Sequence, residues 1–229
     1  MPETDQDLGP ITPDGCAVEV YRRLPGGGEA DLLGRLLPPR SRVLELGCGT
    51  GRLANALAGL GHDVVGVDES ADMLDHLRGV TPVRETIEDL RLDPTFDAVI
   101  LAANLISTAG FERRRRYLDS CERHLADGGL LVAQWFPPSW FDGISAAGGR
   151  ARQIGPVHCR LSLVSADDDR VTAETTYEID DRSWTQRFTA YRMTEDRLAV
   201  ELGLAGLSLE RWVDEAHAWF VARRSAAPR

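Results

Sequence analysis

The chain has 229 residues, of which 43% are hydrophobic and 27% are charged, as in a globular protein that needs no disulfide or metal crosslink to fold. The net charge of −10 disfavours nucleic acid as a partner, because surfaces that bind phosphates are basic. The four cysteines lack zinc-binding spacing and no apolar run approaches the roughly 20 residues that span a bilayer, so we expect a reduced, cytoplasmic protein with no metal and no membrane partner.

Residues 1–28 are predicted to form an N-terminal segment that is part of the active-site cover. The first 14 residues are polar and contain three prolines, which predicts no regular structure. A helix is expected over residues 16–24, and the sequence Pro-Gly-Gly-Gly at 25–28 ends it.

Residues 29–135 show alternating strand and helix patterns. After a helix over 29–37, strands are expected at 42–46, 63–68, 81–84, 96–102 and 130–135, with helices at 51–60, 70–78 and 112–125. Continuous apolar strands between helices indicate a parallel sheet that is covered on both faces. This part is therefore predicted to be the nucleotide-binding core of a doubly wound, Rossmann-like α/β fold.

The pattern changes after the two prolines at 137–138. Residues 136–156 are predicted to be a loop, whereas 157–165, 170–179 and 183–193 alternate like antiparallel strands joined by acidic turns. We expect residues 136–193 to be an antiparallel insertion that caps the acceptor. Residues 194–229 should return to the core with one helix and two closing strands, giving a mostly parallel, seven-stranded sheet with the insertion after its fifth strand.

A glycine loop joins the first predicted strand to the following helix. Gly47 permits a tight turn, Gly49 lets a ligand approach the backbone, and Gly51 lets the helix pack closely on the strand. The spacing is GxGxG, and the sixth position of the dinucleotide pattern GxGxxG is occupied by the bulky Arg52. This substitution disfavours a pyrophosphate ligand.

An acidic residue ends the second predicted strand. Asp68 follows Gly51 by 17 residues, where a carboxylate can accept hydrogen bonds from both hydroxyls of a ribose. The alternative is that Asp68 only caps the helix that begins near Ser70. The glycine loop upstream favours the ribose interpretation.

Four segments together resemble the class I S-adenosylmethionine-dependent methyltransferases, of the small-molecule type. They are Val43-Leu-Glu-Leu-Gly-Cys-Gly-Thr-Gly51, Asp68-Glu69, Thr86-Ile-Glu-Asp-Leu90 and Phe96-Asp-Ala-Val99. The resemblance implies S-adenosylmethionine as the cofactor. It implies that the loop contacts the methionine end, that Asp68 holds the ribose, and that Ile87 and Glu88 contact adenine. The cofactor-binding residues that it implies are Tyr21, Glu45, Gly47, Cys48, Gly49, Asp68, Glu69, Met73, Ile87, Glu88, Leu101 and Ala102.

Two of these positions carry alternatives. Tyr21 corresponds to an aromatic residue that closes over the cofactor in similar enzymes, but a buried helix residue explains it equally well. Many members of the family have an aspartate where Thr86 stands, which leaves the hydrogen bonds to adenine open.

Residues for catalysis and acceptor binding can be proposed only from their place in the predicted topology. Asn104 follows the fourth strand, and His158 in the insertion is the best-placed histidine for a general base, although a lone histidine is more often solvated or packed. Gln134, Trp135, Trp140 and Tyr191 are candidates for substrate binding. Trp184 and Phe188 suit either core packing or an aromatic pocket wall, and the run Arg113–Arg116 is interpreted as a mostly solvated helix face.

The sequence predicts transfer of a methyl group to O, N or C of a small molecule, in the biosynthesis of a secondary metabolite. Two alternatives remain: other chemistry on the same cofactor, such as aminocarboxypropyl transfer or cyclisation, and a nucleotide-binding protein that is non-catalytic or depends on NAD. Exposed strands in the insertion also allow a homodimer.

Overall fold

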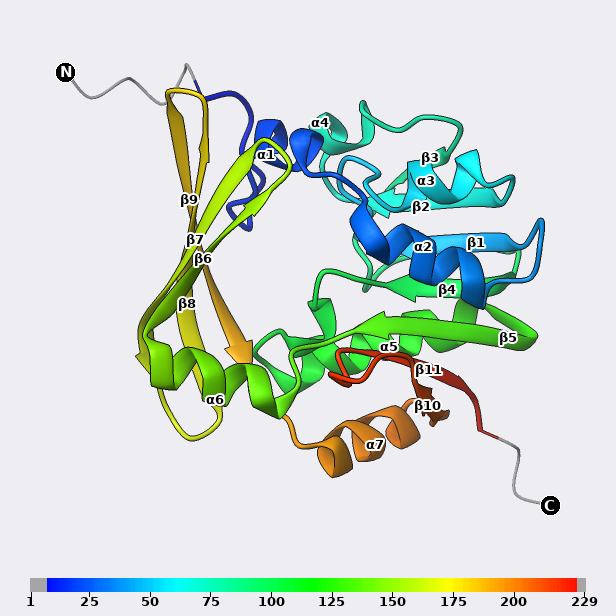
Figure 1. Ribbon diagram of the computed structural model, residues 1–229. Helices are drawn as coiled ribbons and strands as arrows, with labels where there is room; N and C mark the ends of the chain where they lie inside the picture. Colours follow the sequence, from blue (N-terminus) through cyan, green and yellow to red (C-terminus); the bar gives the residue numbers. More distant parts are fainter. Residues whose placement is uncertain (1–7, 226–229) are drawn as a thin grey trace.

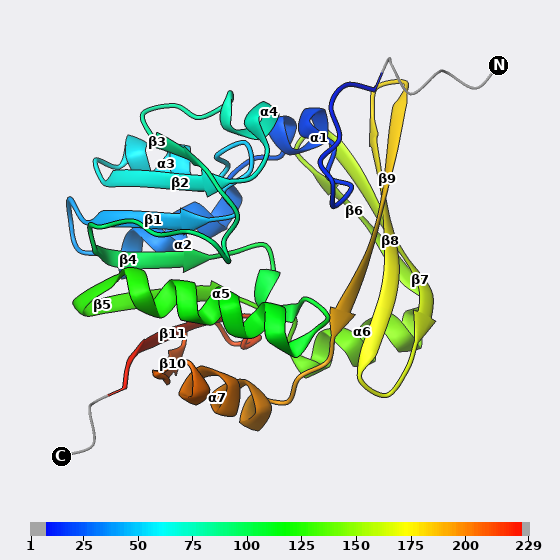
Figure 2. The ribbon, with the colours of Figure 1, turned by 180° about the vertical axis from the view of Figure 1, so that it is seen from behind.

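The computed structural model describes residues 8–225, which form two sheets that stand opposite each other (Figures 1 and 2). The larger sheet has the strand order β10-β11-β5-β4-β1-β2-β3, and β11 is the one strand that runs opposite to the other six, antiparallel to both β10 and β5. Its strands are β1 (Arg42–Leu46), β2 (Asp63–Asp68), β3 (Thr81–Arg84), β4 (Phe96–Leu101), β5 (Leu125–Gln134), β10 (Leu207–Trp212) and β11 (Trp219–Arg224). The predicted seven-stranded, mostly parallel sheet is confirmed.

Helices cover both faces of this sheet, because both faces of its central strands are apolar. In β4, Ala98 and Ile100 face the cluster that packs under α2 (Gly27–Leu36) and α3 (Ala54–Gly59), whereas Val99 and Leu101 face the opposite cluster. That second cluster includes residues of α5 (Phe111–His124) and α7 (Glu195–Leu204). The alternation of side chains along each strand thus produces two cores, one on each face.

The helices after β1 and β2 are shorter than the sequence predicts. Glycine 51 has a φ of +82°, and α3 begins only at Ala54. The short helix α4 (Ala71–Leu74) is capped by the Ser70 hydroxyl, which accepts a hydrogen bond from the Met73 N–H. The Asn55 side chain binds the backbone of the loop that follows α4, so this loop turns back to β3 instead of continuing the helix.

The insertion contains more regular structure than predicted. Residues 136–156, expected to be a loop, form helix α6 (Pro138–Ala147) and strand β6 (Gly149–Ile154). The glycines and prolines mark the ends of these elements: Pro138 occupies the first helical turn, and Gly148 ends the helix with a φ of +69°. The smaller sheet is therefore four-stranded, in the order β6, β7 (Val157–Ala166), β8 (Arg170–Ile179) and β9 (Arg182–Tyr191).

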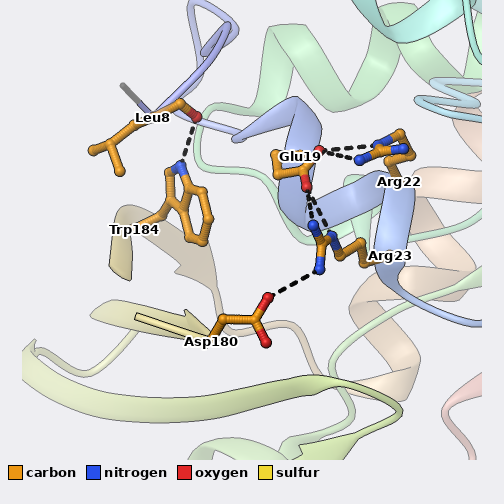
Figure 3. Close-up of polar contacts among 6 residues, drawn as sticks. All are labelled: Leu8, Glu19, Arg22, Arg23, Asp180 and Trp184. Carbon is orange, nitrogen blue, oxygen red and sulfur yellow. Dashed lines mark hydrogen bonds and ion pairs between the residues drawn. The ribbon is translucent and has the colours of Figure 1, made fainter. Parts of the chain in front are cut away.

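The N-terminal segment packs against the insertion. Helix α1 (Val18–Arg23) places Val20 in one apolar cluster with Val157, Ile179 and Trp184 of the smaller sheet. Figure 3 shows two polar links beside this cluster: Trp184 donates a hydrogen bond to the Leu8 carbonyl at 3.0 Å, and Arg23 pairs with Asp180 at 3.3 Å. Segments that are about 170 residues apart in sequence thus form one layer.

The first 14 residues were expected to lack regular structure. Residues 8–14 contain no helix or strand, although Ile11 forms an isolated β-bridge, and residues 1–7 lie outside the described part. Within residues 8–225, no helix is both long and apolar enough to cross a membrane.

Candidate active site

A cavity of about 910 Å³ lies between the two sheets. Its floor is the edge of the large sheet where parallel strands β1, β2 and β4 end, its opposite wall is the inner face of the smaller sheet, and the N-terminal segment contributes Thr12, Asp14, Cys16 and Tyr21. Ligands of open α/β sheets bind at this edge. The geometry therefore brings most of the predicted cofactor residues to one place.

The glycine loop lines the floor of this cavity. Gly47 and Gly49 both have positive φ, +68° and +54°, which glycine adopts without steric cost. A β-carbon on Gly47 would lie 2.7 Å from Leu105 Cδ1, but one on Gly49 would meet only Met73 Sδ, at 3.8 Å. The space beside Gly49 is thus open, as a ligand that approaches the backbone requires. The Cys48 side chain is buried next to the loop.

Glu45 holds an unpartnered carboxylate oxygen at the cavity. The residue is 3% exposed, and its Oε2 atom has no hydrogen-bond partner among the described residues. Burial raises the pKa of Glu45 to about 8, although Arg52 and the backbone N–H of Ala54 oppose the shift. A buried acceptor without a donor calls for a donor group on a ligand. An ammonium group is the donor that also matches the charge.

Asp68 is oriented by backbone donors. Its Oδ2 atom accepts a hydrogen bond from Gly49 N at 2.9 Å, and its Oδ1 atom accepts one from Ser70 N at 3.0 Å. Burial raises the pKa of Asp68, while these two hydrogen bonds act in the opposite direction. Each carboxylate oxygen keeps a free lone pair, so the two oxygens of Asp68 can still accept hydrogen bonds from two adjacent hydroxyls. The capping interpretation is confirmed, and Asp68 also lines the cavity, as the ribose interpretation requires.

Further predicted residues line the same end of the cavity. Met73 and Ile87 are buried apolar side chains, and Glu69 and Glu88 flank them. Glu88 lies 3.6 Å from Arg113. Thr86 donates a hydrogen bond to Asp89 at 3.0 Å, so a carboxylate lies next to this threonine.

The end of β4 supplies one core residue, and the three residues that follow the strand line the cavity. These are Ala102, Ala103 and Asn104, of which Ala103 and Asn104 adopt positive φ, +53° and +57°. Such strained conformations concentrate at functional sites. The Leu101 side chain is fully buried in the core and does not line the cavity, so its prediction is wrong; strand alternation turns it to the opposite side.

His158 does not face the cavity, so its prediction as a general base is wrong. Its neighbours in sequence, Val157 and Cys159, point inward and are buried, and alternation along β7 places His158 on the outer face. There its Nδ1 atom lies 2.9 Å from the Glu178 carboxylate. Among the described residues no group of histidine, cysteine, aspartate and glutamate side chains could hold a metal ion.

Of the four predicted substrate residues, only Trp140 lines the cavity. Gln134 donates a hydrogen bond to Glu29, and Trp135 is buried against Trp212 with a ring separation of 5.8 Å. Tyr191 packs over the Arg114 guanidinium at 4.2 Å. These three predictions are wrong because side-chain direction at a strand end depends on the register with neighbouring strands, which sequence position alone does not reveal.

Two groups of cavity residues contain members that the sequence did not predict. On the N-terminal side, the Gln186 carboxamide accepts hydrogen bonds from Tyr21 and Tyr177, at 3.3 and 3.5 Å, and its nitrogen lies 3.0 Å from Cys16 Sγ. Tyr21 therefore reaches the cavity, and its hydroxyl connects the N-terminal helix to the insertion.

The second group is an aromatic wall, which we define as Phe136, Trp140 and Phe188, and of these Phe136 was not predicted. The rings of Phe136 and Trp140 stack at 4.0 Å, and those of Phe136 and Phe188 at 6.1 Å. Phe188 thus follows the pocket interpretation and Trp184, which is buried, follows the core interpretation. Arg150 and Arg152 of β6 border this wall. They were missed because their segment was predicted to be a loop.

Comparison with known proteins agrees with this site. Residues 43–129 match the family model described as a methyltransferase domain, and this segment contains the glycine loop, Asp68 and Ile87. Residues 43–129 therefore resemble a methyltransferase domain, in agreement with the resemblance of the sequence to the class I S-adenosylmethionine-dependent methyltransferases. The cofactor of this family is S-adenosylmethionine.

Similarity to individual proteins extends beyond the domain itself. The chain is 35% identical over 158 residues to cypemycin N-terminal methyltransferase from a Streptomyces species, and the match covers 63% of each chain, less than two thirds of that relative. It is 28% identical over 162 residues to dTDP-3-amino-3,4,6-trideoxy-alpha-D-glucopyranose N,N-dimethyltransferase from Streptomyces venezuelae, with 66% of this chain and 67% of that one covered.

A solved structure matches almost the whole chain. The sugar N-methyltransferase KedS8 from Streptoalloteichus is 21% identical, covers 99% of both chains, and superimposes with a TM-score of 0.73. The overall fold is therefore shared.

Proposed function

We propose that this protein transfers a methyl group from S-adenosylmethionine to a nitrogen atom of a small natural product or amino sugar. The observation that supports this most is the single cavity that joins the Gly47–Gly49 loop and Asp68 to the aromatic wall of the insertion. Its volume of about 910 Å³ is at the upper end of the range for small-molecule sites, as two ligands side by side require.

The residues at the floor fit the cofactor. The unpartnered Oε2 atom of Glu45 would accept from the amino group of the methionine end, and Asp68 would accept from the ribose hydroxyls. Met73 and Ile87 would contact adenine through apolar surface. When bound, S-adenosylmethionine supplies an electrophilic methyl group on a sulfonium centre.

The residues around the acceptor favour nitrogen over oxygen. An amine loses its proton to water before it attacks, whereas an alcohol needs a base within the site. No histidine lines the cavity within residues 8–225, and burial raises the pKa of Tyr177 to about 12 and that of Tyr21 well above its ordinary value. Both phenols remain protonated at neutral pH. The chain's part in the reaction is then to position the acceptor close to the methyl group.

The relatives support the same atom and class of acceptor. By name, the Streptomyces venezuelae enzyme is an N,N-dimethyltransferase of an amino sugar, and the cypemycin enzyme is an N-terminal methyltransferase. We also propose that the N-terminal segment and the insertion act together as the cover of the acceptor, because one apolar cluster joins them.

The test is incubation with S-adenosylmethionine and paired acceptors, an amino sugar nucleotide and its hydroxyl counterpart, together with a peptide that has a free amino terminus. We expect S-adenosylhomocysteine to form with an amine and not with the matching alcohol, and the product to gain one methyl group on nitrogen by mass spectrometry and NMR. Methylthioadenosine as the product would contradict methyl transfer and support aminocarboxypropyl transfer. Methylation of the alcohol would contradict the choice of nitrogen.

A further inference from the structure

The two halves of the cavity carry opposite charge. The floor, formed by the core, is lined by six carboxylates, Glu45, Asp68, Glu69, Glu85, Glu88 and Asp89, against three arginines, Arg52, Arg113 and Arg116, so that acidic groups predominate there. The opposite wall, formed by the insertion, presents Arg150 and Arg152 of edge strand β6. A cofactor that is cationic at its sulfonium and ammonium groups matches the floor, which leaves the arginines to the acceptor.

The orientation of these two arginines follows from the strand register. Arg150 pairs with Leu161 and Arg152 pairs with Cys159 across the β6–β7 ladder, and both partners line the cavity. Residues directly opposite each other share one face of a sheet, so both arginines face the cavity side. Ala151, between them, pairs with Arg160, which therefore lies on the outer face.

Arg150 and Arg152 also lack acidic partners. Other arginines of the insertion form ion pairs: Arg160 with Glu178, Arg170 with Asp169, Arg187 with Glu174, and Arg192 with Asp142. No carboxylate of the described residues lies within ion-pair distance of Arg150 or Arg152, although the protein has a net charge of −10. Desolvation and the neighbouring Arg152 lower the pKa of Arg150. Two like charges held together without a counter-ion are stabilised by an incoming anion.

We propose that Arg150 and Arg152 form an oxyanion subsite for the acceptor, which holds a phosphate or a carboxylate group. This inference rests on the proposed function and specifies its substrate class: the acceptor carries an amine and an anionic group. Guanidinium groups present planar forks of N–H donors that match both kinds of oxyanion.

The aromatic wall adds a second requirement. The Arg150 guanidinium lies 5.9 Å from the centre of the Trp140 ring, and Trp140 stacks on Phe136. An acceptor whose anion contacts the arginines therefore places its adjacent carbon skeleton against aromatic rings. The site best fits an anionic group attached to an apolar or flat ring.

Three small aromatic probes separate the contribution of the oxyanion from that of the ring. Phenyl phosphate and benzoate each join a flat ring to an oxyanion, and benzamide is the neutral counterpart of benzoate. They would be titrated by ligand-observed NMR into the protein saturated with S-adenosylhomocysteine. We expect at least one oxyanion probe to bind about tenfold or more tightly than benzamide, as for hydrogen bonds to charged groups. The preferred oxyanion identifies the source, phosphate or carboxylate.

The variant Arg150→Gln/Arg152→Gln should reduce oxyanion affinity to the level of benzamide without changing benzamide binding. Arg160→Gln is the matched control, because it removes an arginine from the outer face of the next strand, and it should leave all three probes unaffected. Arg152→Lys should retain part of the affinity, since it keeps the charge but loses the fork. Thermal melts check that each variant is folded.

The inference is overturned if neither oxyanion binds more tightly than benzamide, or if the double variant retains the wild-type preference. The proposed function fails separately, through a different measurement: the wild-type protein would not bind S-adenosylhomocysteine by calorimetry, or would yield no methylated amine. Retained S-adenosylhomocysteine binding without an oxyanion preference contradicts only the subsite.

Discussion

Asp68 and Gly49 are joined across the cavity floor: the Asp68 Oδ2 atom accepts a hydrogen bond from Gly49 N at 2.9 Å. This contact connects the end of β2 to the glycine loop after β1, so the proposed ribose acceptor and the proposed methionine contact are held in one arrangement. A change at either residue is expected to affect cofactor binding through both parts.

The first prediction concerns Asp68→Ala. The substitution removes the acceptor for the ribose hydroxyls and the hydrogen bond to Gly49 N. We expect S-adenosylhomocysteine affinity, measured by calorimetry, to fall by about 1.5–3 kcal/mol, as for charge-assisted hydrogen bonds. Asp63→Ala is the control, because Asp63 lies at the other end of β2 and forms only an exposed ion pair with Arg42. Equal affinity in wild type and Asp68→Ala would refute the ribose assignment.

The second prediction concerns glycines 49 and 51. Gly49→Ala should abolish cofactor binding but lower the free energy of unfolding by only about 1–2 kcal/mol, the cost of a left-handed backbone conformation, since no described atom lies closer than 3.8 Å to the added carbon. Gly51→Ala should cost more, about 2–4 kcal/mol, because its β-carbon would lie 2.5 Å from Leu77 and 2.6 Å from Asn55. Denaturant titration and calorimetry measure the two effects. The reverse order of stabilities would contradict the packing described for the loop.

The third prediction is the pH dependence caused by Glu45. Burial raises the pKa of this group from 4.5 to about 8, so the folded, cofactor-free protein binds a proton that the unfolded chain has lost. Stability therefore falls as pH rises between these two values. Glu45→Gln removes the effect, and we expect it to raise the free energy of unfolding at pH 8 by about 1–3 kcal/mol.

At pH values below 4.5, Glu45 is neutral in both states, and the difference between wild type and Glu45→Gln should vanish. Cofactor affinity should have the opposite pH dependence to stability. The wild type should bind the cofactor more tightly as pH rises and Glu45 ionises, whereas Glu45→Gln should bind it weakly at all pH values. If Glu45→Gln were less stable than the wild type at pH 8, the Oε2 atom of Glu45 would have a hydrogen-bond partner in the folded protein.

The fourth prediction concerns a buried ion pair. Arg114, expected to lie on a solvated helix face, is 1% exposed and forms a bidentate pair with Glu201 at 2.8 and 2.9 Å. Arg114→Ala should lower the free energy of unfolding by about 3 kcal/mol, because it leaves the buried Glu201 carboxylate with Arg197 as its one remaining charged partner among the described residues. Arg115→Ala, one residue later, removes only an exposed pair with Asp119 and should cost less than about 1 kcal/mol.

Acid titration provides a second measurement of this pair. Burial would raise the pKa of Glu201, but hydrogen bonds from Arg114 and Arg197 lower it below its ordinary value of 4.5. The contribution of ionised Glu201 to the free energy of unfolding is therefore present at neutral pH and is lost as pH falls below 4.5. The melting temperatures of wild type and Arg114→Ala should converge at low pH. A constant difference would mean that the loss is one of packing.

The fifth prediction concerns the contact between the N-terminal segment and the insertion (Figure 3). Trp184→Phe removes the donor to the Leu8 carbonyl, and Arg23→Ala removes the pair with Asp180. Both should increase amide hydrogen exchange in residues 8–24. Arg22→Ala is the matched control, since Arg22 pairs only within its own helix. Equal exchange in all three variants would contradict the proposed joint cover.

The nucleotide-binding half could be predicted almost completely. The helix cap at Ser70 depends on the nearby Met73, the contact between Gly49 and Asp68 joins the ends of two adjacent strands, and the strands of the core have continuous apolar patterns. The insertion could not be predicted to the same depth. Its first strand carries Arg150 and Arg152 and no apolar alternation, because one face borders a cavity and the other is exposed.

The sequence by itself determined the fold class and the cofactor, because local spacing specifies a glycine turn, a strand-end acid and the apolar strands around them. Only the tertiary structure decided which side chains meet the acceptor. It turned His158 outward and Trp135 into the core, and it brought Tyr21, Phe188 and the two arginines to one cavity. The physical reason is register: a shift of one residue reverses the face of a strand side chain, and register is set by pairing with distant segments.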